Sequence, residues 1–319
     1  MKPLSIVKQL CNLPSRIGES EADCRQLITD ALMQAAIPFE LQEFNSKRPN
    51  FIDYSLKVDG VRIDCLPTGL MSGEITNNYN LISSLTSSQS FIDTPNINFN
   101  PKSDAICQCN FYFAPSLAIS RRDVPKVMNA KEIHGNVIVE PIKYRTANIL
   151  VGNRINPKTI VFAHYDAYFA GATDNASGVA VALSLIQQEP ILLKDTLVVF
   201  AGNEELSYDY PIYWGRCFRE FARQNRRILE STERIIVIDS VGDGEPVLET
   251  DPKLLSLAFP IGDEPDILMK SCILTGDFDS LMTVYHSASD VVSRLSPAYL
   301  DSALILLREL LKTQKSRAR

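Results

Sequence analysis

The chain has 319 residues, a formal net charge of −6, seven cysteines and only three histidines. With 45% hydrophobic residues, this length allows one large domain or a core domain that carries an insertion, and it excludes a disordered or collagen-like chain. No apolar run approaches the roughly 18 residues of a membrane span, and the first residues lack the apolar stretch of a secretory signal, so we expect a cytoplasmic protein with no membrane partner. The mild acidity argues against a nucleic-acid partner, and the odd number of scattered cysteines argues against a disulfide framework.

The first predicted element is a surface helix at 19–37, because apolar residues recur near helical spacing up to Ala36 and Pro38 ends the pattern. Between about Phe44 and Pro141 the pattern changes to alternating stretches, such as 54–63, among clusters of Asn, Ser, Pro and Thr. We therefore predict a β-rich insertion at 45–140 within a larger domain made of residues 1–44 and 141–319.

From residue 148 onward the pattern becomes α/β. Short apolar runs at 159–163, 197–201 and 234–238 alternate with predicted helices at 178–187, 211–230 and 297–311. Such β-branched runs between helices are typical of buried strands. The fold class we predict is α/β, with a mostly parallel or mixed central sheet flanked by helices and the small β-rich insertion. In the helix at 211–230 we expect Trp214 in the apolar stripe and the arginines on a solvated face, and we expect Ser296 to cap the last helix.

Ionisable residues follow each of the three predicted strands. His164 and Asp166 follow the first, Glu204 and Glu205 the second, and Asp239 the third. The carboxyl ends of neighbouring parallel strands open on one crevice, so we expect these side chains to converge. Asp166, on the same side of the strand as His164, is placed to orient its imidazole. No Lys or Arg stands beside these acids in the sequence, and buried unpaired carboxylates are costly, which predicts one or two divalent cations.

Two later motifs complete the candidate site. Asp174 lies in Gly-Ala-Thr-Asp-Asn-Ala-Ser-Gly, where small residues let the backbone come close and the carboxylate could bridge two metals. His286 adds a second imidazole, with Asp290 close behind. Mixed nitrogen and oxygen ligands without thiolate favour zinc, and Co²⁺ or Mn²⁺ also suit these ligand types. The adjacent glutamates would divide into one ligand and one general base.

In chain order, these motifs resemble those of the dizinc aminopeptidases in family twenty-eight of the metallopeptidases: His164-x-Asp166, Asp174-Asn-Ala-Ser-Gly178, Glu204-Glu205, Asp239, and Tyr285-His286 with Asp290. The resemblance is strong over about residues 150–295 and looser around the N-terminal helix. It implies a zinc-exopeptidase fold of the phosphorylase/hydrolase-like type. It also implies two zinc ions per chain, one held by His164, Asp174 and Asp239 and the other by Asp174, Glu205 and His286. Glu204 would be the catalytic base, and Asp166 would orient His164.

The activity that this resemblance implies is hydrolysis of N-terminal residues from peptides with a free N-terminus, through a metal-bridged water and the Glu204 base. The chain departs from the family in three places. Residues 276–280 read Gly-Asp-Phe-Asp-Ser where members often carry Ser-Asp-His, no tyrosine lies between Asp239 and Tyr285 as an oxyanion donor, and the spacing from His164 to Asp174 is short. The insertion resembles protease-associated or lid domains, particularly at 114–123.

Two other functions stay open. The phrase Gly-Ala-Thr-Asp174 also resembles glutaminyl cyclases, transferases on the same scaffold that use one zinc, although the continuation Asn-Ala-Ser-Gly favours a peptidase. The complete ligand set argues against a non-catalytic, peptidase-like binding protein. Elsewhere, we expect His134 at the surface or at a helix C-cap and no metal at Cys107-x-Cys109, and residues 207–210 either line the substrate mouth or form a plain loop. The sequence does not predict the oligomeric state.

Overall fold

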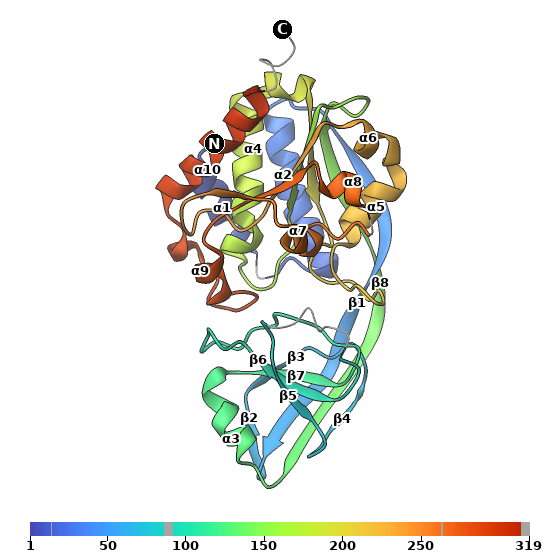
Figure 1. Ribbon diagram of the computed structural model, residues 1–319, viewed down its shortest axis with the longest axis vertical. Helices are drawn as coiled ribbons and strands as arrows, with labels where there is room; N and C mark the ends of the chain where they lie inside the picture. Colours follow the sequence, from blue (N-terminus) through green and yellow to red (C-terminus); the bar gives the residue numbers. More distant parts are fainter. Residues whose placement is uncertain (14, 86–91, 263, 314–319) are drawn as a thin grey trace.

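A nine-stranded mixed sheet runs through the molecule, which Figure 1 shows as an upper and a lower lobe joined by the paired strands β1 and β8. The computed structural model describes residues 1–13, 15–85, 92–262 and 264–313. The strand order is β12-β13-β11-β9-β10-β8-β1-β2, with β4 paired to β8. The strands are β1 (Phe39–Val58), β2 (Val61–Ile63), β4 (Gly73–Ile75), β8 (Ile133–Gly152), β9 (Thr159–His164), β10 (Thr196–Ala201), β11 (Arg234–Ile238), β12 (Val247–Glu249) and β13 (Ser271–Thr275).

The three predicted strands are β9, β10 and β11, and they are parallel neighbours at the centre of the upper sheet. β8 runs antiparallel to β10 and to β1, which makes the sheet mixed. Along β9, Ile160 and Phe162 belong to one core cluster while Val161 and Ala163 belong to the other, as the alternation of a strand buried on both faces requires. The predicted α/β class is confirmed.

Helices cover both faces of the upper sheet (Figure 1). One core cluster joins the sheet to α1 (Pro3–Cys11), α2 (Glu21–Gln34), α4 (Ser177–Gln188) and α10 (Pro297–Lys312). The other joins it to α5 (Arg216–Gln224), α6 (Arg226–Ser231) and α8 (Pro265–Leu268), with α7 (Pro252–Ala258) packed near β13. The predicted helices at 19–37, 178–187 and 297–311 correspond to α2, α4 and α10, although the Ser296 side chain makes no capping hydrogen bond.

The single helix predicted at 211–230 is wrong. Two helices, α5 and α6, are separated at Asn225, and Trp214 lies before α5, half-buried, with its indole N–H donated to Leu257 O. The chain enters α5 through Gly215 at φ +68°, where an added Cβ would lie 2.1 Å from Pro260. Only glycine fits this close left-handed turn, so the helix begins at Arg216 rather than at 211.

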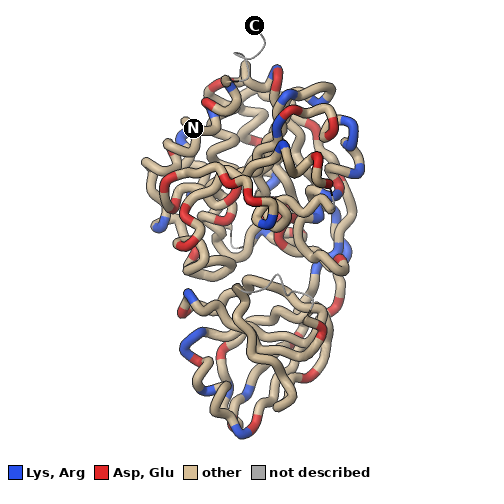
Figure 2. Tube along the Cα trace, viewed as in Figure 1, with Lys and Arg blue, Asp and Glu red and all other residues tan. Residues whose placement is uncertain are grey.

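The lower lobe consists of residues 59–85 and 92–132 and the distal ends of β1 and β8. These two strands pair along their whole length, from Phe39↔Val151 to Val58↔Ile133. A second sheet there has the order β3-β7-β6-β5, formed by β3 (Cys65–Pro67), β7 (Ser116–Ile119), β6 (Asn96–Phe99) and β5 (Asn80–Ser83), with α3 (Val124–Met128) beside it. A separate core cluster that includes Leu56, Ile97 and Leu117 fills this lobe. Figure 2 shows acidic and basic residues interspersed along both lobes.

An aromatic cluster joins the two lobes. Phe111 of the lower lobe lies 5.7 Å, ring centroid to ring centroid, from Tyr168 and 5.5 Å from Tyr213 of the upper lobe. Leu70 and Leu206 complete its buried part. The carboxyl ends of β9 and β10 lead directly into the residues of this junction, so the candidate site lies where the lobes meet.

Candidate metal centre

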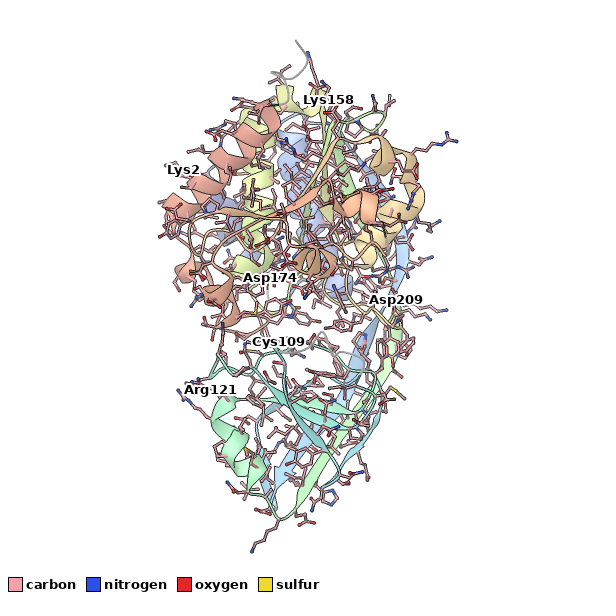
Figure 3. The ribbon with its side chains drawn as sticks, viewed as in Figure 1. Lys2, Cys109, Arg121, Lys158, Asp174 and Asp209 are labelled. Atoms are coloured by element: carbon pink, nitrogen blue, oxygen red, sulfur yellow. The ribbon has the colours of Figure 1, made fainter. Side chains whose placement is uncertain are left out.

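The predicted site residues come together at the carboxyl ends of adjacent strands. His164 is the last residue of β9, Glu204 and Glu205 follow the end of β10, and Asp239 follows β11. Because the order is β11-β9-β10, these three strand ends are neighbours. Figure 3 labels Asp174, which faces the lower lobe from this edge of the sheet.

Asp174 lies between the two imidazoles. Its Oδ1 is 3.2 Å from His164 Nε2 and its Oδ2 is 3.4 Å from His286 Nε2. Asp239 Oδ1 lies 3.7 Å from His164 Nε2, and Glu205 Oε2 lies 2.7 Å from His286 Nε2. Each imidazole therefore faces one oxygen of Asp174 and one further carboxylate.

Main-chain carbonyls face the other ring nitrogen of each histidine. His164 Nδ1 is 3.1 Å from the carbonyl oxygen of Asp166 and 3.6 Å from its carboxylate, so the carbonyl is the closer partner. The Asp166 carboxylate instead accepts the Glu205 N–H at 2.8 Å, which ties the ends of β9 and β10 together. His286 Nδ1 is 3.1 Å from the carbonyl oxygen of Gln108 in the lower lobe. With Nδ1 held in this way, Nε2 of each ring points at the carboxylates.

The motif around Asp174 is fixed by its neighbours. The Asp290 carboxylate accepts the backbone N–H groups of Thr173 and Asp174 at 2.8 and 3.0 Å. Asn175 donates to Ile238 O at 2.8 Å and accepts the Gly178 N–H at 3.0 Å. A Cβ at Gly178 would lie 2.4 Å from Asn175 Oδ1, so this position requires glycine. The Asp-Asn-x-x-Gly spacing thus anchors the Asp174 carboxylate against the end of β11.

The site is almost closed to water. His164, Asp166, Asp174, Glu204, Glu205 and His286 are all buried, while the Asp239 side chain keeps 24% of its exposure. Burial raises the pKa of Glu204 well above its usual range, and the negative charges of Glu205, Asp166 and Asp239 add to that rise. Burial likewise raises the pKa of Glu205 to about 7, although His286 opposes it. Burial lowers the pKa of both histidines, but their carboxylate neighbours outweigh it and hold both values well above the usual range.

These donors fit a bound cation. Ligand atoms of His164, Asp174 and Glu205 all lie within 4.8 Å of one another. Glu205 Oε1 and Asp166 Oδ1 are buried without a hydrogen-bond partner, and a buried orphan carboxylate oxygen is costly unless a cation neutralises it. Nitrogen and oxygen donors without thiolate are the set that zinc takes in catalytic sites. The residues present therefore fit the metal that the motifs predict.

Sequence reasoning missed two neighbours of the site. The Tyr168 ring lies 4.7 Å from the His286 ring, centroid to centroid, and its buried hydroxyl has no hydrogen-bond partner. Tyr168 follows Asp166 by two residues, so its place after the strand end was a usable signal. Gln108 contacts His286 through its main chain, which leaves no signature in the residue type.

The other singled-out residues lie outside this cluster. His134 is exposed, as expected for a surface residue, but in β8 rather than at a helix end. Cys107 and Cys109 are buried free thiols. In the 207–210 loop the Tyr208 N–H donates to Lys47 O, and the exposed Tyr210 packs its ring on Phe113.

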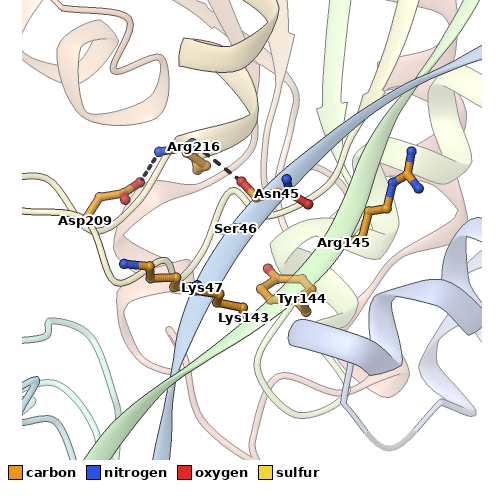
Figure 4. Close-up of a pocket in the computed structure, with 8 residues that line it drawn as sticks. All are labelled: Asn45, Ser46, Lys47, Lys143, Tyr144, Arg145, Asp209 and Arg216. Atoms are coloured by element: carbon orange, nitrogen blue, oxygen red, sulfur yellow. Dashed lines mark hydrogen bonds and ion pairs between the residues drawn. The ribbon is translucent and has the colours of Figure 1, made fainter.

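A separate cavity of about 670 Å³ lies where this loop crosses β1 and β8 (Figure 4). It is lined by Asn45, Ser46, Lys47, Lys143, Tyr144, Arg145, Asp209 and Arg216, and the predicted site residues are not among them. In Figure 4 the Arg216 guanidinium reaches Asp209, and the two groups are 3.0 Å apart. This ion pair is one of several that hold the α5 arginines, since Asp209 and Glu220 together pair with Arg216, Arg219 and Arg223.

Comparison with known families agrees with this geometry. Residues 147–243 match the model described as peptidase family M28. This segment of the chain is similar to that peptidase family. That segment includes His164, Asp174, Glu204, Glu205 and Asp239, so the resemblance predicted from the motifs is confirmed there. No curated protein matches the chain.

Solved structures with the same fold include zinc aminopeptidases. BSAP, a zinc aminopeptidase from Bacillus subtilis, has a TM-score of 0.69 at 16% identity, covering 100% of this chain and 96% of that chain. The aminopeptidase from Aneurinibacillus sp. strain AM-1 has a TM-score of 0.64 at 15% identity, with 95% and 90% covered. Porphyromonas gingivalis glutaminyl cyclase has a TM-score of 0.52 at 14% identity, with 98% and 97% covered.

At these identities the structures establish the fold. The match of residues 147–243 to peptidase family M28 agrees with the predicted class of an enzyme that acts on peptide bonds. Among the helices of the described ranges, none combines the length and apolar character that a bilayer crossing requires.

Proposed function

We propose that this protein is a zinc-dependent aminopeptidase that removes N-terminal residues from peptides. The observation that carries the proposal is the Asp174 carboxylate, whose two oxygens face the His164 and His286 imidazoles, with the buried Glu204 beside them. A carboxylate shared between two imidazole-carboxylate sets is the arrangement expected of a two-metal hydrolase.

Two zinc ions per chain are proposed, with Co²⁺ or Mn²⁺ as alternatives on ligand type. His164, Asp174 and Asp239 would hold one ion, and Asp174, Glu205 and His286 the other. When bound, zinc supplies Lewis-acid chemistry, because it lowers the pKa of a coordinated water and stabilises negative charge on a carbonyl oxygen.

The remaining steps belong to side chains of this chain. Glu204 takes a proton from the attacking water and returns it to the leaving amine. Burial raises the pKa of Glu204, which makes its carboxylate a stronger base for the proton of the water. The Asp166 carbonyl keeps His164 Nδ1 occupied, while the Asp166 carboxylate holds the backbone of Glu205.

The substrate proposed is a peptide with a free N-terminus, bound where the lobes meet. We propose a cytoplasmic protein, because all seven cysteines are free thiols. We also propose that it has no membrane or nucleic-acid partner, because charges of both signs are interspersed along the chain. The division into a catalytic domain (1–44 and 141–319) and a protease-associated-like or lid insertion (45–140) is also a proposal. Residues 45 and 140 lie within β1 and β8, which the two parts share.

The direct test is zinc stoichiometry measured alongside hydrolysis of a panel of aminoacyl chromogenic substrates. We expect two zinc ions per chain and release of the N-terminal residue, and His286→Ala should lose one ion and most of the activity. Fewer than one zinc per chain, with no response to added zinc, would support a non-catalytic binding protein instead.

Glutaminyl cyclase chemistry is the second candidate, because cyclases from Porphyromonas gingivalis and Fimbriiglobus ruber share the fold. An N-terminal Gln peptide separates the two reactions. Free glutamine as the product supports the aminopeptidase, whereas pyroglutamate with one zinc per chain would overturn it.

A further inference from the structure

His286 is held differently from the candidate ligands at the strand ends. His164, Glu205 and Asp239 lie at or just after strand ends, where the sheet fixes their backbone. His286 instead lies in a turn after α9 (Phe278–Met282), at φ +49° in the left-handed region. A ligand on such a turn needs partners outside its own segment to fix the direction of its ring.

Those partners come from the lower lobe. The Gln108 N–H donates to His286 O at 2.9 Å, and Gln108 O lies 3.1 Å from His286 Nδ1. This reciprocal pair fixes both the backbone and the ring of His286. With Nδ1 donating to the carbonyl, Nε2 stays free to face Glu205 Oε2 at 2.7 Å.

We call residues 100–109 the strap, because further contacts tie this segment to residues 279–286. Asn100 Nδ2 donates to Met282 O at 2.8 Å, Lys102 pairs with Asp279 at 2.6 Å, and Cys109 Sγ lies 3.6 Å from Tyr285 O. Figure 3 labels Cys109 opposite Asp174 at the junction of the lobes.

Two buried amide side chains shape the strap. Asn100 Nδ2 lies 3.5 and 3.7 Å from the sulfurs of Cys107 and Cys109, and Gln108 Nε2 donates to Pro67 O at 2.8 Å. Asn100 is fully buried and Gln108 is 9% exposed, so neither contact is exchanged for water without cost. These side chains therefore hold the Gln108 main chain against His286.

We propose that the strap of the lower lobe positions His286, with Asn100 and Gln108 as positioning residues, and that it thereby sets the zinc affinity of the Asp174, Glu205 and His286 site. The inference rests on the proposed function for the identity of the metal. It gives the lower lobe a part in the metal centre beyond covering it. Loss of an outer partner of a ligating histidine typically costs about 10–100-fold in metal affinity.

The test is competition of the full-length, metal-free protein with a chromophoric chelator for zinc alone. We expect Gln108→Ala and Asn100→Ala each to weaken one of two zinc sites by about tenfold and to leave the other unchanged. Asn129→Ala is the matched control, because this exposed lower-lobe asparagine follows α3 and donates back to Pro125 O of that helix. It should bind zinc like the wild type.

A double-mutant cycle separates positioning from general damage. In a His286→Ala background, Gln108→Ala should cause no further loss of zinc affinity, whereas in a His164→Ala background it should still weaken the remaining site. Unchanged zinc affinity in both single variants, or the same additional loss in both backgrounds, would overturn the proposal. If the wild type binds two zinc ions and hydrolyses no peptide, the proposed function fails while the cycle still decides the role of the strap.

Discussion

Glu204→Gln separates the proposed base from the ligands beside it. The substitution keeps the shape of the side chain but removes its ability to accept a proton from water. A positioned general base contributes about 10²–10⁴-fold to the rate, or about 2.7–5.4 kcal/mol of the barrier. Glu204 is 8% exposed, so bulk water cannot easily take over its role, and we expect kcat to fall by an amount within this range.

Zinc binding and folding should survive the substitution. The ligand contacts run between His164, His286, Asp174, Asp239 and Glu205, and a neutral amide at 204 leaves them in place. Burial and the neighbouring carboxylates already disfavour a charge at 204, as the raised pKa of Glu204 records, so the metal-free variant should unfold at a temperature no lower than that of the wild type.

The assay compares kcat, zinc content and melting temperature in the wild type, Glu204→Gln and Glu205→Gln, with the exposed Glu245→Gln as control. Glu205→Gln should lose zinc together with activity, and Glu245→Gln should match the wild type. A Glu204→Gln enzyme that keeps more than a tenth of kcat with full zinc would refute the assignment of Glu204 as the base.

Three further predictions test the scaffold by denaturant unfolding of the metal-free protein. The buried Phe162 ring has its centroid 5.1–5.4 Å from those of Phe218, Phe221 and Phe259. Phe162→Ala should therefore lower the free energy of unfolding by about 3–5 kcal/mol, whereas Phe278→Ala, at a half-exposed position, should change it by no more than about 0.5 kcal/mol. Equal losses in the two variants would contradict this packing argument. Arg16 is fully buried and donates to the carbonyls of Tyr165, Ala170 and Gly171. Arg16→Lys should therefore lower the free energy of unfolding by about 1–3 kcal/mol, because it leaves a buried carbonyl unpaired, while the exposed Arg122→Lys should be neutral. An unchanged denaturation midpoint for Arg16→Lys would show that these hydrogen bonds are dispensable. Burial raises the pKa of Glu21 to about 8 from 4.5, so between these two pH values the folded state binds more protons than the unfolded state. The free energy of unfolding should therefore fall as pH rises, by at most about 1.4 kcal/mol per pH unit, and Glu21→Gln should remove this slope. Parallel wild-type and variant curves between pH 4.5 and 8 would exclude the linkage.

The strand-end cluster was predictable because its signal is local. His164, Glu204 and Asp239 each follow an apolar β-branched run, and the parallel order of three adjacent strands brings them to one edge. The small residues around Asp174 were the signal that predicted its place in the site. The structure explains them, because Asn175 donates to Ile238 O at the end of β11 and a Cβ at Gly178 would collide with Asn175.

Tertiary contacts without a residue-type signature were not predictable. The start of α5 at Arg216 follows from the close packing of Gly215 against Pro260, which the periodicity of the arginines and aromatics does not indicate. β1 and β8 have 20 residues each, whereas strands usually have about 3–10. The polar clusters inside these two long strands therefore resemble the ends of shorter strands, and they led to the predicted insertion boundaries at 45 and 140. The Gln108 carbonyl reaches His286 through a backbone atom that any residue would supply.

The small number of histidines bears on how many cations the site takes. With three histidines in the chain and His134 exposed on β8, two imidazoles face the carboxylates of Asp174, Glu205 and Asp239. With a cation at His164 alone, the buried Glu205 carboxylate, whose Oε1 has no hydrogen-bond partner, would have His286 alone to balance its charge. With a cation at His286 alone, the Asp239 carboxylate would have His164 alone. Because Asp174 turns one oxygen toward each imidazole, occupancy of both sides satisfies every one of these carboxylates at once. This balance of charges is the reason why we propose two cations rather than one, and with them an aminopeptidase rather than a one-zinc cyclase.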